Sequence, residues 1–150
     1  MDATPHNIAL ELLRQMSADG NLRAATLESY GAEPLFYIDD DDPGEYSPHV
    51  VATPGESSGE GGGGEISIRL LASAHDEDVA PCQILPGETG EDSAGAKFER
   101  FALAALAAAK RTTPGAILVS HSAEWDYAGL APLRYVIFTL NYRTINAFGD

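Results

Sequence analysis

The stretch at residues 96–119 reads AKFERFALAALAAAKRTTPGAILV, and it joins a helical pattern, a break and the start of a strand. Its apolar side chains recur at helical spacing and define one face, formed by Phe98, Phe101, Ala102 and Ala105 and widened by Leu103 and Leu106. Thr113-Pro114-Gly115 then breaks the helix. We expect a helix over 96–110 that packs its aromatic stripe against a sheet.

Two strands are predicted after this helix. The first begins at residues 116–119 and continues through the polar segment around His121 and Glu124. The second covers residues 133–142, LRYVIFTLNY, where apolar side chains occupy both alternating sets of positions. That pattern predicts a strand buried over most of its length.

Before the helix, three further strands are predicted. Residues 65–73 read EISIRLLAS and alternate apolar with polar side chains, as a half-buried strand does. Residues 34–38, PLFYI, are typical of a short buried strand bounded by Pro34 and by the acidic run 39–42. A further strand is expected at 49–53.

The chain begins with a predicted helix. Thr4 and Pro5 are a plausible start, and Asp19-Gly20 ends the run. The apolar positions between them fall at helical spacing: Ile8, Leu12, Leu13 and Met16. Residues 22–30 fit either a short helix or a turn.

This order of elements lacks βαβ alternation. It predicts a single α+β domain over residues 1–150, with a mixed or antiparallel sheet and helices packed on one face. Residues 54–64 read PGESSGEGGGG and contain no apolar side chain, so we expect a flexible loop there. The loop is too short to separate two domains.

Composition indicates a globular chain, with 44% hydrophobic and 21% charged residues. The formal net charge of −14 repels phosphate backbones, which argues against nucleic-acid binding. Cys82 is the one cysteine, so an internal disulfide and a zinc site built from several thiolates are excluded. The sequence lacks a signal-peptide pattern and a membrane-length apolar run, and we expect synthesis in the cytoplasm.

Motifs that resemble binding sites lack the required context. The run 59–64, GEGGGG, matches a dinucleotide-binding pattern, but a strand follows where a helix is needed, so no cofactor is expected. The acidic run 39–42 lacks the ligand spacing of a calcium loop, and we expect a solvated turn without metal. Residues 75–78 read HDED and are similarly dense in polar side chains, but we expect a loop without the apolar neighbours that would desolvate them.

The residues that could carry out catalysis also lack the arrangement that catalysis requires. His121, Glu124 and Asp126 are suitable for acid–base chemistry, but in an extended strand Glu124 and Asp126 share one face and His121 points to the other. The serines beside His121 lack a nucleophile motif, and Cys82 lacks a neighbouring positive charge. We therefore expect no catalytic residues. Trp125, Tyr127 and Tyr135 fit a contact surface and a core equally well.

Three features taken together resemble the tail terminator, or tail completion, proteins of long-tailed bacteriophages. The first is the helix IALELLRQM (8–16) leading to PLFYI. The second is an extended loop before EISIRLL, followed by a helix that opens with KFERF (97–101). The third is the closing pair of strands GAILV (115–119) and RYVIFTLNYR (134–143), separated by EWDYAGLAPL. The resemblance covers most of the chain and rests on the order of elements and on composition.

This resemblance implies a structural virion protein that forms a homo-oligomeric, six-membered ring. Such a ring caps the finished tail tube and joins it to the head connector, which would place the protein in the tail or neck of the virion. Interaction residues are expected in the Gly-rich loop and in the acidic-aromatic segment, at Gly59, Gly61, Gly64, Trp125 and Tyr127. Three alternatives stay open: another neck or connector component, a small enzyme using His121, Glu124 and Asp126, and a regulatory binding module.

Overall fold

The computed structural model describes residues 4–38, 46–58, 63–76, 83–91, 93–126 and 133–145. Three helices and five strands follow one another in the order α1 (Pro5–Ser17), α2 (Gly20–Tyr30), β1 (Leu35–Ile38), β2 (His49–Ser58), β3 (Gly63–His75), α3 (Ala94–Lys110), β4 (Ile117–Asp126) and β5 (Leu133–Ile145). The strands form one mixed sheet, and the fold is α+β, as the sequence predicts.

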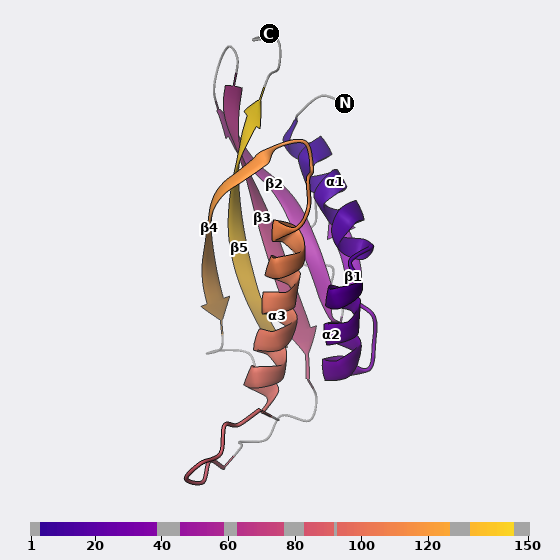
Figure 1. Ribbon diagram of the computed structural model, residues 1–150, viewed down its shortest axis with the longest axis vertical. Coiled ribbons are helices and arrows are strands. Elements are labelled where there is room, and N and C mark those ends of the chain that lie inside the picture. Colours follow the sequence, from indigo (N-terminus) through magenta and orange to yellow (C-terminus); the bar gives the residue numbers. More distant parts are fainter. Residues whose placement is uncertain are drawn as a thin grey trace.

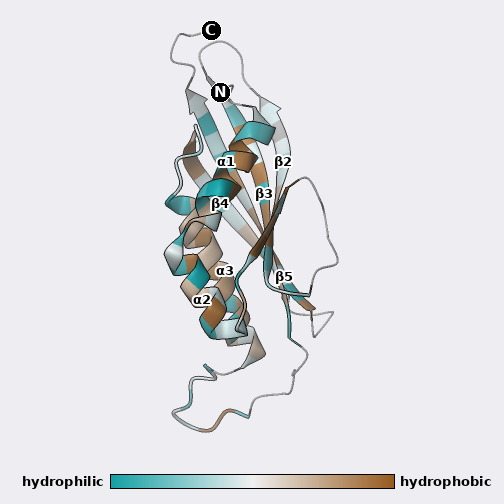
Figure 2. Ribbon diagram, turned by 90° about the vertical axis from the view of Figure 1, so that its right-hand side faces the viewer, coloured by the Kyte–Doolittle hydropathy of each residue, from teal (hydrophilic) through white to brown (hydrophobic). Residues whose placement is uncertain are grey.

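The sheet has the strand order β1-β2-β3-β5-β4. β1 and β2 run parallel, and every other neighbouring pair is antiparallel. The longest pairing joins β3 to β5, from Gly63 opposite Ile145 to His75 opposite Leu133. Figure 1 shows the three helices in front of the sheet, and Figure 2 shows them gathered on one of its sides. The molecule therefore has two layers.

Each helix begins at a side chain that caps its first turn. Thr4 accepts a hydrogen bond from the backbone N–H of Asn7, and Pro5 occupies the first turn of α1, as predicted. Asp19 caps α2, and Gly31 ends that helix in the left-handed conformation, with φ of 67°. The segment that fitted a helix or a turn is therefore a helix of 11 residues.

The core lies between the sheet and the helices. The alternating side chains of β3 and β5 fill it from the sheet, at Ile66, Ile68, Leu70, Val136, Phe138, Leu140 and Tyr142. The helices contribute Ile8, Leu12, Met16, Leu22, Phe98 and Phe101. Both the period of two predicted in β3 and the aromatic stripe predicted in α3 are confirmed. Burial of these side chains is the main favourable contribution to folding.

Three burial predictions are wrong. β1 is an edge strand and not a buried one, and 38% of Leu35 is exposed, because among the described strands only β2 pairs with it. Among its described side chains, β5 fully buries only Val136, Phe138, Leu140 and Tyr142, since the helices cover one face of the sheet. Leu103 is 50% exposed, so the buried face of α3 is narrower than its sequence suggests.

The predicted loop at 54–64 is also wrong over most of its length. Residues 54–58 belong to β2 and residues 63–64 to β3, while residues 59–62 lie outside the described residues. A bulge between Pro54 and Ser57 accommodates Gly55 in the strand. A Cβ atom on Gly55 would lie 2.6 Å from the carbonyl oxygen of Ser67, so glycine here permits a close backbone approach. Pairing with the neighbouring strands therefore orders a segment whose composition is typical of loops.

Candidate assembly surface

None of the described helices covers the opposite face of the sheet (Figure 2), and we call it the open face. Strand register defines rows of side chains across it. One row runs Tyr37, Val51, Leu71, Ile137 and Glu124 from β1 to β4. Val51 is fully buried in this row, and Leu71 and Ile137 are half-buried. The centre of the open face is therefore apolar, although no described helix covers it.

The next row along the open face is more polar. It runs Leu35, His49, Ser73, Tyr135 and Asp126. A hydrogen bond with the Asp126 carboxylate is the main cause that raises the pKa of the Tyr135 hydroxyl. His49 is buried, and its Nδ1 lies 2.8 Å from the carbonyl oxygen of Ser47, to which it donates. Its buried Nε2 has no hydrogen-bond partner among the described residues.

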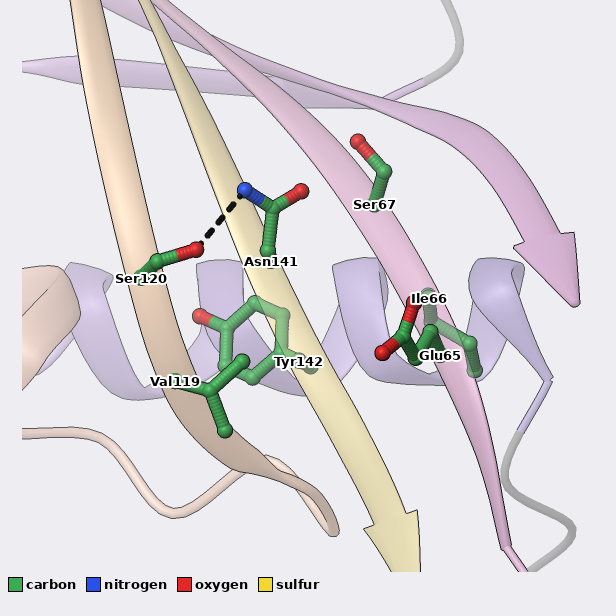
Figure 3. A pocket seen from close by; sticks show the side chains of 7 residues that line it. All are labelled: Glu65, Ile66, Ser67, Val119, Ser120, Asn141 and Tyr142. Carbon is green, nitrogen blue, oxygen red and sulfur yellow. Dashed lines mark hydrogen bonds between the residues drawn. The ribbon is translucent and has the colours of Figure 1, made fainter. Parts of the chain in front are cut away.

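A pocket of about 340 Å³ opens where β4, β5 and β3 meet near the bulge of β4 (Figure 3). Ser67, Ser120 and Asn141 face it, and the Asn141 amide donates to the Ser120 hydroxyl over 3.0 Å. Glu65 and Tyr142 complete the polar lining. Burial raises the pKa of the Tyr142 hydroxyl to about 12, with Thr112 acting in the opposite direction, so this phenol stays protonated near neutral pH. Glu65 is the carboxylate of this lining, and no described hydrogen bond joins it to the Ser67 or Ser120 hydroxyl.

β4 forms the longer free edge of the sheet. Its side chains are exposed over most of Ile117–Asp126, and two of them are large and apolar: Ile117 is 53% exposed and Val119 is 47% exposed. Natural sheet edges are usually protected by charged side chains such as lysine, by proline, by a β-bulge or by a short length. The strand ILVSHSAEWD has Glu124, Asp126 and a bulge between Leu118 and Ser120, but it contains no lysine or proline.

Trp125 connects this edge to the helical layer. Its ring makes edge-on contacts with Phe98 of α3 at 6.2 Å and with Phe138 of β5 at 6.0 Å, measured between ring centroids. The tryptophan is half-buried and packs against the core. These ring contacts agree with the interpretation that Trp125 fills the core. Its role in interaction with another chain stays a prediction.

The register of β4 confirms the predicted separation of His121 from the two acids. His121 lies opposite Leu140, whose side chain is buried on the helical face of the sheet. Glu124 lies opposite Ile137 and Asp126 lies opposite Tyr135, and both pairs are on the open face. The three side chains are therefore not brought together, because successive residues of a strand alternate between its two faces.

The structure describes some of the other predicted residues. Gly64 lies within β3, where its carbonyl oxygen accepts a hydrogen bond from Thr144 over 3.2 Å, so it is not part of a loop. His75 stacks against Tyr46, with 4.6 Å between ring centroids. Gly59, Gly61, Tyr127, Cys82 and the acidic run 39–42 lie outside the described residues.

Sequence reasoning missed the edge position of β4. No sequence signal marked that position, because uncharged runs such as ILVSHSA at 117–123 also occur within a helix, as in FALAALAAA at 101–109. Among the described residues, no group of three or more His, Cys, Asp or Glu side chains is arranged to hold a metal ion. None of the described helices is long and apolar enough to cross a membrane.

Comparison of the chain with protein-family models gives no match, and comparison with curated proteins gives none either.

Proposed function

We propose that this protein is a structural subunit of a phage tail, which assembles with copies of itself into a six-membered ring that caps the tail tube and joins it to the head connector. The observation that carries this proposal is the exposed edge of the sheet at β4. This edge exposes Ile117 and Val119, whereas Val51 at the centre of the open face is fully buried. Exposed apolar side chains on a strand edge are typical of a surface that another chain covers.

The resemblance to tail terminator proteins supports the same function. It rests on the helix that opens with KFERF and on the two strands that follow it. The enzymatic alternative is less well supported, because His121 lies on the opposite face of the sheet from Glu124 and Asp126. The pocket beside Ser120 contains the Glu65 carboxylate, but no described hydrogen bond joins that carboxylate to a serine hydroxyl. An acidic subunit suits a channel through which DNA passes, because its carboxylates repel the phosphates of the DNA.

Three measurements test the proposed function. Native mass spectrometry of the purified protein should show one discrete closed oligomer, and negative-stain electron microscopy should show rings. Added to tails that lack their terminator, the protein should bind one end of the tube and restore joining to heads. A protein that stays monomeric at its highest soluble concentration and does not bind tails would contradict the proposal.

A further inference from the structure

The two edges of the described sheet are β1, which is short, and β4, which is longer, and these two strands run in opposite directions. β1 runs parallel to β2, and three antiparallel pairings then separate β2 from β4. β4 therefore runs antiparallel to β1 of the same chain. If a second copy is placed beside the first with its helices on the same side, its β1 meets β4 as an antiparallel strand. Antiparallel pairing is also the arrangement of most of the sheet.

We propose that β4 of one subunit pairs with β1 of the next, so that the sheet continues from copy to copy. This inference rests on the proposed function, because it names the contact that would build the ring. The contact joins two different edges and is therefore heterologous. Contacts of that type repeat around a ring, whereas a self-complementary contact ends at a dimer.

Side chains on the two edges match when the rows of the sheet continue across the contact. Extending the rows places Leu35 of the second copy opposite Asp126, Phe36 opposite Trp125, and Tyr37 opposite Glu124. Phe36 and Trp125 both lie on the helical face, and both pack against the core. Cross-strand aromatic pairs are among the more favourable pairs in antiparallel sheets.

Charge does not oppose the pairing of β1 with residues 124–126. β1 reads LFYI and carries no charged side chain, so nothing of like charge lies opposite Glu124 and Asp126. This matters in a chain of net charge −14, because like charges directly opposite one another destabilise a strand pair.

A pairing of β4 with β4 of a second copy is less favourable. A two-fold axis near Ser122 would place the bulge at Val119 opposite Trp125 of the partner, and this would happen in both halves of the contact. Bulges disrupt the ladder of hydrogen bonds where they occur. The four residues of β1 instead fit beside the regular segment 120–126 and do not reach the bulge.

Disulfide cross-linking tests the proposed contact. In a Cys82→Ser background, the double variant Leu35→Cys, Asp126→Cys should form a ladder of covalent oligomers under mild oxidation, ending at the size of the ring. An equimolar mixture of the two single variants should give covalent dimers and no larger species. The matched control is Leu35→Cys with Thr139→Cys, which lies on the interior strand β5 and should give no ladder. The variant Ser122→Cys alone reports a two-fold β4 contact.

The outcomes separate this inference from the proposed function. A ladder with the Leu35, Asp126 pair and none with the control supports edge pairing. If the protein forms rings by mass spectrometry but gives no ladder, or gives efficient dimers with Ser122→Cys, the edge contact is wrong and the ring remains. If no oligomer forms at any concentration, both are wrong.

Discussion

Gly55 occupies a position in β2 where any side chain would collide with backbone. A Cβ atom there would lie 2.6 Å from the Ser67 carbonyl oxygen, and backbone cannot yield as a flexible side chain does. We expect Gly55→Ala to lower the free energy of unfolding by about 1–3 kcal/mol, the usual cost of overpacking. Chemical denaturation measures this loss.

Gly20 provides the matched control. It begins α2, and nothing lies within 4 Å of a Cβ atom built there. Gly20→Ala should leave stability unchanged or raise it by up to about 1 kcal/mol, because alanine restricts the unfolded chain. Equal losses for the two variants would contradict the steric explanation.

Asp19 and Arg111 tie the start of α2 to the end of α3. The guanidinium donates to both carboxylate oxygens, over 2.8 and 2.9 Å. Burial by itself would raise the pKa of Asp19, but the Leu22 N–H and Arg111 together hold it below its ordinary value of 3.8. A lowered pKa means that this carboxylate stabilises the fold at neutral pH and that the contribution is lost as pH falls below about 4, through the folded-state pKa.

Asp19→Asn tests this pH dependence. Asparagine still caps the helix, so the variant removes mainly the charge pairing with Arg111. At neutral pH we expect a loss of up to about 1 kcal/mol, as for a partly exposed ion pair. Thermal unfolding at several pH values should show the two proteins converging in acid. A difference that persists undiminished in acid would show that the effect is not electrostatic.

The edge strand β4 packs against the core through Leu118 and Trp125, and Trp125 has the larger side chain. Because its ring packs on Phe98 and Phe138, we expect Trp125→Ala to cost about 2–4 kcal/mol, somewhat less than loss of a fully buried tryptophan. Hydrogen exchange should show β4 opening before the rest of the sheet. His121→Ala is the control on the same strand and the same face, and its exposed side chain should change stability by no more than about 0.5 kcal/mol. A similar loss in both variants would mean that Trp125 is not the anchor.

The end of the β2–β3 hairpin contributes strand pairs that a loop would not. Ser57 and Ser58 pair with β3, and Gly63 and Gly64 pair with β5. Replacing all of residues 54–64 by a tight turn should therefore lower the melting temperature, since these pairs are lost. Shortening the chain only within residues 59–62 removes none of the described pairs, and the melting temperature should stay close to that of the original protein. Differential scanning calorimetry of the two deletions decides between a strand and a loop role for the flanking residues.

Net charge acts on the assembled protein as a whole. Subunits with a net charge of −14 repel one another, while the proposed contact between β4 and β1 is largely apolar. We expect association to strengthen with salt, because the screening length falls from about 10 Å at 0.1 M to about 3 Å at 1 M. Sedimentation velocity at low and high sodium chloride measures this trend. Association that weakens with salt would point to a contact between opposite charges.

Local sequence patterns predicted an element correctly where that element depends only on residues that are near one another in the chain. Thr4 and Pro5 predicted the start of α1, and the alternation in 65–73 predicted a half-buried strand. The separation of His121 from Glu124 and Asp126 was also predictable, because the two faces of a strand alternate in every sheet. These features depend only on neighbours along the chain, and so they could be derived from the sequence.

The tertiary structure decided which strands lie at the edges. PLFYI and ILVSHSAEWD carry no mark that separates an edge from a centre, because edge position depends on which other strands pair beside them. The same holds for residues 54–58 and 63–64, whose composition favours a loop but whose backbone is ordered by partners as distant along the chain as Ile145, which pairs with Gly63. Hydrogen bonding between distant strands outweighs local propensity there. The candidate assembly surface consists of these edges and of the open face, and it emerges only when the sheet is complete.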